Sequence, residues 1–188
     1  MSRCKPALLS MFLIAATAWA SASHEVALGT ASLGAGASEV HNHAPYPDSA
    51  QGLKQQLKDM RELARSRRSD QLRVMISSLE FPDARAWYLA NFGTPGLETA
   101  DYYKKTLRES QSRLENQMIQ FAHQDGYFSV KKQNAKKVFP TLITDPEIFL
   151  AAWESGYGED RSETPFGYFV FVDGKFRWDS STMWVTVD

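Results

Sequence analysis

His123 is the histidine that falls within the part of the chain we expect to fold, and it lies two residues before Asp125. An imidazole suits general acid–base catalysis, and a carboxylate can hold it in one tautomer. The alternative is structural, because a histidine near the carboxyl end of a helix interacts favourably with the helix dipole. Residues two apart on a helix also point in different directions, so we favour the structural role.

Three further histidines, His24, His41 and His43, lie near the amino terminus, with carboxylates close by in the sequence. Such a set could bind zinc or copper. Ordering a flexible segment around a metal costs conformational entropy, however. We favour incidental histidines in a disordered segment, and we assign no cofactor.

Aromatic residues make up 12% of the chain. Large rings with polar atoms can line a pocket for an apolar or sugar-like ligand, although core packing is their commoner use. The ligand-binding candidates are Trp87, Tyr88, Phe92, Trp153 and Tyr168. No phosphate-binding glycine loop, nucleophile elbow, zinc-protease helix or calcium loop accompanies them.

The first 22 residues have the layout of a secretory signal peptide. Arg3 and Lys5 precede an apolar stretch over residues 7–20, and small residues at Ala18-Trp19-Ala20 or Ala20-Ser21-Ala22 offer cleavage sites. The apolar stretch is shorter than the roughly 20 residues that span a bilayer. We therefore expect cleavage and export to the periplasm or the extracellular space, with no transmembrane segment in the mature chain.

Cleavage would change the chemistry available to the chain. It would remove Cys4, the only cysteine, and with it any disulfide, thiolate nucleophile or cysteine metal site. The 21 basic residues would fall to 19 while 22 acidic residues remain, which gives no case for nucleic-acid binding.

Residues 23–47 are rich in Ala, Gly and Ser and predict a flexible tether, so residues 48–188 should form one domain. Apolar residues at helical spacing predict a helix from Ser49, a second capped by Ser69 or Asp70, and a short third helix that stops at Gly93. A long fourth helix should span about residues 98–123.

Strands are predicted over residues 127–133, 148–154, 166–172, 175–179 and 183–187. The second of these could instead be a short buried helix. Asp173-Gly174 predicts a two-residue hairpin turn that pairs Val172 with Lys175. That register places Phe169, Phe171, Phe176 and Trp178 on one face, which we take as the core face. The fold class is therefore α+β, with amino-terminal helices packed on an antiparallel meander.

The stretch Tyr168–Arg177, read after these helices, resembles the closing hairpin of uncharacterised exported bacterial proteins with a nuclear transport factor two or SnoaL-like domain. The resemblance implies a cone-shaped α+β fold that can enclose a pocket, in a superfamily that holds both enzymes and binding proteins. We expect an exported, non-catalytic domain that binds an unknown small molecule or envelope protein. The alternatives are a SnoaL-like pocket enzyme that uses a His/carboxylate pair, and metal binding by the tether.

Overall fold

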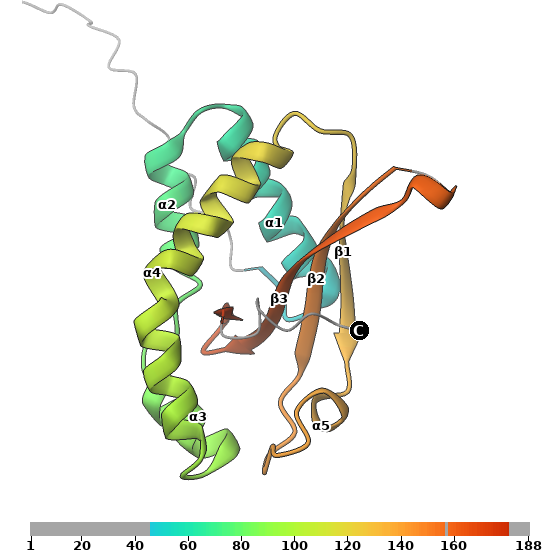
Figure 1. Cartoon of the computed structure of the whole chain (residues 1–188). Coiled ribbons are helices and arrows are strands. Elements are labelled where there is room, and N and C mark those ends of the chain that lie inside the picture. Colours follow the sequence, from blue (N-terminus) through green and yellow to red (C-terminus); the bar gives the residue numbers. More distant parts are fainter. Residues whose placement is uncertain (1–45, 157, 181–188) are drawn as a thin grey trace, which may run out of the picture. The chain divides into compact units, whose positions relative to one another are not determined.

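The computed structural model describes residues 46–156 and 158–180, and every structural statement below concerns these residues (Figure 1). Four helices precede the sheet, and only one short helix lies between its strands, which confirms the α+β class. The elements, in chain order, are α1 (Ala50–Arg65), α2 (Ser69–Ser77), α3 (Ala84–Phe92), α4 (Gly96–Phe121), β1 (Tyr127–Gln133), α5 (Ala135–Val138), β2 (Ile148–Ser155), a 3-10 turn (Gly158–Asp160), β3 (Ser162–Val172) and β4 (Lys175–Asp179). The strand expected over residues 183–187 lies outside the described residues.

Side chains cap the amino-terminal ends of α1 and α3, whereas α2 and α4 begin without a side-chain cap. The Ser49 side chain accepts a hydrogen bond from the amide of Gly52 at 3.0 Å and caps α1, as predicted. Asp83 caps α3 in the same way. The prediction for α2 was wrong, because Ser69 is already helical and Arg68 occupies the cap position without a side-chain hydrogen bond.

The four strands form an antiparallel meander in the order β1-β2-β3-β4. The predicted hairpin register is confirmed, with Val172 opposite Lys175 and Phe169 opposite Trp178. Asp173 and Gly174 both have positive φ, at 51° and 73°, as a two-residue turn that matches the strand twist requires. Residues 148–155 are a strand rather than a helix, which settles the alternative left open by their pattern.

A β-bulge interrupts the pairing of β2 with β3. Ala151 pairs with Gly167 and Ala152 pairs with Pro165, which leaves Phe166 without a partner across the strand. The extra residue shifts the alternation of side chains by one position. Phe166 and Phe169 consequently face the same side of the sheet although they are three residues apart.

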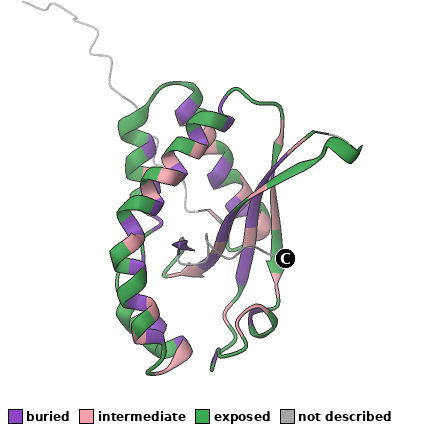
Figure 2. Ribbon diagram, viewed as in Figure 1, coloured by how far each residue is buried: buried purple, intermediate pink, exposed green. Residues whose placement is uncertain are grey.

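Two hydrophobic clusters lie on opposite faces of the sheet, as the alternation along each strand requires. Figure 2 shows buried residues in purple on both the helices and the strands. The first cluster joins α1, α2 and the carboxyl half of α4 to one face, and its strand members are Phe128, Phe149, Ala151, Trp153, Phe166, Phe169, Phe176 and Trp178. The second cluster joins α3 and the amino half of α4 to the other face, and its members include Phe81, Tyr88, Ala100, Tyr103, Leu107, Ile148 and Val170. The sheet therefore has two covered faces near β4, where the sequence had suggested only one.

The segment between α2 and α3 covers the outer edge of β4. The amide of Trp178 donates to the carbonyl of Leu79 at 2.9 Å. The guanidinium of Arg177 donates to the carbonyls of Ser78 and Glu80 at 2.9 and 2.8 Å. An open strand edge invites pairing with other chains, and these contacts close it.

Candidate functional site

His123 and Asp125 lie on the surface just after α4, which ends at Phe121 rather than at His123 as expected. Both side chains are exposed. Within residues 46–156 and 158–180, no hydrogen bond or ion pair joins them, so the structure shows no assembled acid–base pair at this position.

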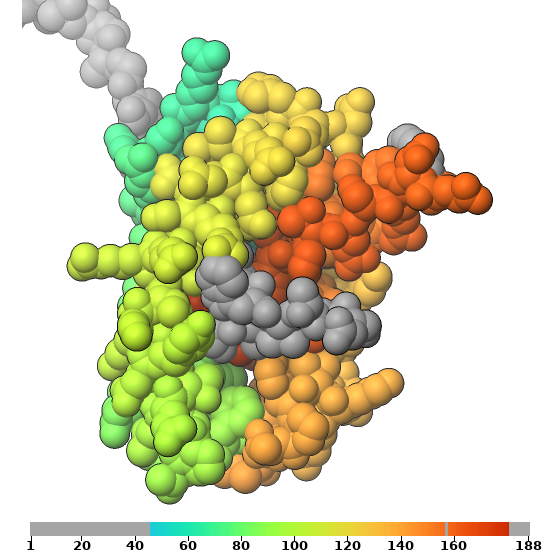
Figure 3. Space-filling model, viewed as in Figure 1, coloured from blue at the N-terminus to red at the C-terminus, as the bar shows by residue number. Residues whose placement is uncertain are grey.

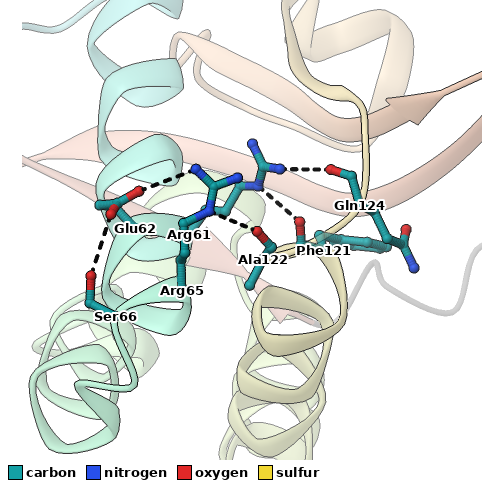
Figure 4. A network of polar contacts seen from close by, with 7 residues as sticks. All are labelled: Arg61, Glu62, Arg65, Ser66, Phe121, Ala122 and Gln124. Carbon is teal, nitrogen blue, oxygen red and sulfur yellow. Dashed lines mark hydrogen bonds and ion pairs between the residues drawn. The ribbon is translucent and has the colours of Figure 1, made fainter.

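Two arginines of α1 perform the capping role expected of His123 (Figure 4). Arg61 donates to the carbonyls of Phe121 and Gln124 at 2.8 and 2.7 Å, and Arg65 donates to that of Ala122 at 3.1 Å. These carbonyls carry the negative end of the α4 dipole, so a guanidinium both satisfies and neutralises them. His123 is not needed for this purpose, because two fixed cations already occupy the helix end.

The guanidinium of Arg61 also lies 4.7 Å from the centre of the Trp153 ring, a cation–π geometry. Burial lowers the pKa of Arg61, but its ordinary pKa is so high that it stays charged. This network joins α1, α4 and β2, and we assign it a structural role.

The five aromatic candidates do not form one group. Tyr88, Trp87, Phe92 and Tyr168 belong to or pack against the second cluster, whereas Trp153 belongs to the first cluster on the opposite face of the sheet. Tyr88 and Trp153 are almost completely buried, at 0% and 1% exposure. The rings contact one another, as in the 5.9 Å separation of Tyr88 and Phe92, and their packing contributes to the core.

A buried carboxylate, Glu154, lies on β2 directly after Trp153. The side chain of Glu154 is only 3% exposed and accepts hydrogen bonds from Tyr127 at 2.5 Å and from Arg161. Lys131 places its ammonium 4.0 Å from the same carboxylate. The hydrogen bond from Tyr127 holds the pKa of Glu154 below its ordinary value, with Arg161 acting in the same direction. The group is therefore a fixed anion and is poorly suited to donate a proton near neutral pH.

An open groove of about 300 Å³ lies between α2 and α4. In Figure 3, side chains of α4, in yellow-green, project beside those of α2 along the left border of the molecule. The residues that line the groove come from one face of each helix and are spaced one, three or four positions apart. They are Arg73, Ile76, Ser77, Arg108, Gln111, Ser112 and Glu115.

An ion pair ties the two walls of this α2/α4 groove together. The Nε atom of Arg73 lies 2.9 and 3.2 Å from the two carboxylate oxygens of Glu115. The hydrogen bond with Glu115 raises the pKa of Arg73, so the guanidinium stays charged. Ile76 is also part of the lining but is only 2% exposed, so the accessible contacts come mainly from the charged and polar side chains. The groove can therefore offer charged and hydrogen-bonding contacts to a small polar ligand.

Sequence reasoning missed this groove. The polar stripe on α4 could be found from helical spacing, since Arg108, Gln111, Ser112 and Glu115 share one face. Nothing in the sequence indicates that α2 lies beside that stripe, because the pair Arg73–Glu115 spans 42 positions.

The described residues hold no group of three or more His, Cys, Asp or Glu side chains arranged to bind a metal ion. His24, His41 and His43 lie outside them. No described helix is both long enough and apolar enough to cross a bilayer. Comparison of the chain with protein-family models, with curated proteins and with solved structures finds no match.

Proposed function

We propose that this chain is an exported, non-catalytic domain that binds a small ligand in the α2/α4 groove. The observation that carries the proposal is the groove itself, an open depression whose two walls are bridged by the ion pair between Arg73 and Glu115. Because α2 and α4 pack in the same hydrophobic cluster, the groove is formed before a ligand arrives, which lowers the entropic cost of ordering the site.

Export rests on the amino-terminal segment. Its basic start, apolar stretch and small residues before position 23 form the pattern of a cleaved signal peptide. The absence of cysteine after Cys4 suits an oxidising compartment, where a free thiol would be a liability.

The acid–base candidates favour binding over catalysis. His123 is exposed and makes no hydrogen bond with Asp125 among the described contacts. Glu154 is held as an anion by Tyr127 and Arg161, away from the α2/α4 groove. The resemblance to SnoaL-like domains and the metal-binding tether stay predictions.

A ligand screen with two matched variants tests the proposal. The mature chain is heated with separate panels of neutral sugars, amino acids, organic acids and phosphorylated compounds, since a ligand that binds the folded state raises the melting temperature. Ser112→Trp places a large ring in the groove, whereas Gln120→Trp places the same ring on an exposed turn of α4 outside it. We expect at least one compound to stabilise the wild type and Gln120→Trp but not Ser112→Trp.

Two outcomes would contradict the proposal. One is a screen in which no compound raises the melting temperature of the wild type. The other is stabilisation that Ser112→Trp leaves unchanged, because the ligand would then bind elsewhere. Export is tested separately, by expressing the full chain in a bacterium and sequencing the amino terminus of the exported product; a chain that starts at Met1 in the cytoplasm would refute it.

A further inference from the structure

We propose that the ligand of the α2/α4 groove carries a carboxylate or phosphate group, and that Arg108 binds this group. The inference rests on the proposed function, since it names the chemical class of the ligand for the same site.

Arg108 is the cation in the groove that lacks a partner within the described part of the chain. The other groove cation, Arg73, binds Glu115 and also lies 3.6 Å from Asp70. Arg108 makes no hydrogen bond or ion pair with a residue in 46–156 or 158–180. With Glu115 neutralised by Arg73, the lining keeps one uncompensated positive charge.

The same charge excess continues along α4. Lys104 and Lys105 lie one turn before Arg108 on neighbouring positions of the helix, are exposed, and form no ion pair with a described residue. Among the acids of α4, Asp101 is paired with Arg85 at 3.3 Å, Glu109 with Arg113 and Glu115 with Arg73. Glu98, in the first turn of the helix, forms no ion pair with a described residue. Three adjacent cations therefore face solvent at one end of the groove, and their summed potential attracts anions.

The groups around Arg108 fit an oxygen anion. A guanidinium presents parallel N–H donors that match two oxygens of a carboxylate or a phosphate. Gln111 contributes an amide, and Ser77 and Ser112 contribute hydroxyls, none of which hydrogen-bonds another described side chain. The volume of about 300 Å³ lies at the lower end of small-molecule sites, which points to a compact ligand.

Calorimetric titration of the mature chain tests the inference with three probes: citrate for carboxylates, and inorganic phosphate and pyrophosphate for phosphates. Each probe is titrated into the wild type, Arg108→Gln and Lys58→Gln. The last variant removes one exposed positive charge from α1, and so matches the change in net charge without touching the groove. Melting temperatures verify that all three proteins are folded.

We expect at least one probe to bind the wild type and Lys58→Gln alike, and to bind Arg108→Gln at least tenfold more weakly. Binding by citrate alone would assign carboxylates, and binding by the phosphates alone would assign phosphates. Equal binding to wild type and Arg108→Gln would overturn the inference, as would equal weakening by Lys58→Gln, which indicates an effect of net charge only.

Absence of binding by all three probes would also overturn it. That outcome is separable from failure of the proposed function. A neutral ligand whose stabilisation is lost in Ser112→Trp would keep the groove as a binding site and refute only its anionic specificity. A groove that binds no compound of any class would refute both.

Discussion

The hydroxyl of Tyr88 donates a 2.7 Å hydrogen bond to the Oδ1 atom of Asp179, and this bond joins α3 to β4 across 91 positions of the chain. Both side chains are buried, with exposures of 0% and 4%. Aromatic rings surround the pair, including Phe81 and Tyr103 at 5.9 and 6.0 Å from the Tyr88 ring. A carboxyl group in such surroundings depends on its hydrogen bonds to offset desolvation.

Replacing Tyr88 with Phe should lower the free energy of unfolding by about 1–2 kcal/mol, because the ring stays while Asp179 loses one buried donor. Urea denaturation measures the change. Tyr102→Phe on α4 is the control, since its ring is 46% exposed and its substitution should shift the free energy by less than about 0.5 kcal/mol. Equal effects of the two variants would contradict a special role for the Tyr88–Asp179 bond.

Glu154 should make stability depend on pH. Its pKa is lowered on folding by the hydrogen bond from Tyr127, so it contributes stability above its unfolded pKa of about 4.3 and loses that contribution as the pH falls through the lower folded value. Glu154→Gln should therefore cost about 1–2 kcal/mol near neutral pH. The difference from wild type should shrink below about pH 4.3.

Chemical denaturation across this pH range measures the Glu154 effect, with Glu109→Gln as control. Glu109 is 70% exposed and lies 4.0 Å from Arg113, so its loss should change stability by less than about 0.5 kcal/mol. A difference between wild type and Glu154→Gln that grows as the solution becomes more acidic would show that the sign of our argument is wrong.

Arg61→Gln should loosen the end of α4. The variant removes the donors to the carbonyls of Phe121 and Gln124 and the charge above Trp153, at an expected cost of about 1–3 kcal/mol. Hydrogen exchange followed by mass spectrometry should show faster exchange around residues 119–126 than elsewhere. Lys58→Gln on the same helix should leave these amides unchanged, and uniform acceleration over the whole domain would contradict a local effect.

Gly126→Ala tests how tightly β1 begins against β2. A Cβ atom at this position would lie 2.5 Å from the carbonyl oxygen of Glu154 and 2.5 Å from the ring of Trp153. The backbone has to move to relieve such contacts, so we expect a loss of about 2–3 kcal/mol in unfolding free energy. Gly174→Ala adds strain at φ of 73° but meets nothing within 4 Å, and should cost only about 1 kcal/mol. A smaller effect at Gly126 than at Gly174 would contradict the steric argument.

Local signals predicted the local parts of this fold. The Asp173-Gly174 pair predicted a two-residue turn. The alternation of Phe169, Phe171 and Phe176 then predicted which residues of β3 and β4 lie opposite each other. Ser49 caps its helix as predicted, because a short side chain can reach the free amides that follow it. These features depend on neighbours within a few positions.

Features made by distant residues were not predictable in the same way. The bulge at Phe166 arises from the pairing of β3 with β2. The amino-acid sequence of β3 alone does not show that the register of this pairing shifts by one residue. Capping of α4 by Arg61 and Arg65 needs two helices to meet, so His123 was the only visible candidate. The α2/α4 groove was not predictable for the same reason. In the sequence, each of its walls is an ordinary polar face of a helix, and the groove forms only where the two helices meet.

The passage of α4 from one hydrophobic cluster to the other has a consequence for how the domain comes apart. Leu114 and Met118 belong to the first cluster and Tyr103 and Leu107 to the second, on a single uninterrupted helix. Neither hydrophobic cluster can unfold while the other stays folded unless α4 unwinds in the middle. A destabilising substitution in one cluster should therefore also destabilise the other, and the two clusters should unfold together as one cooperative unit.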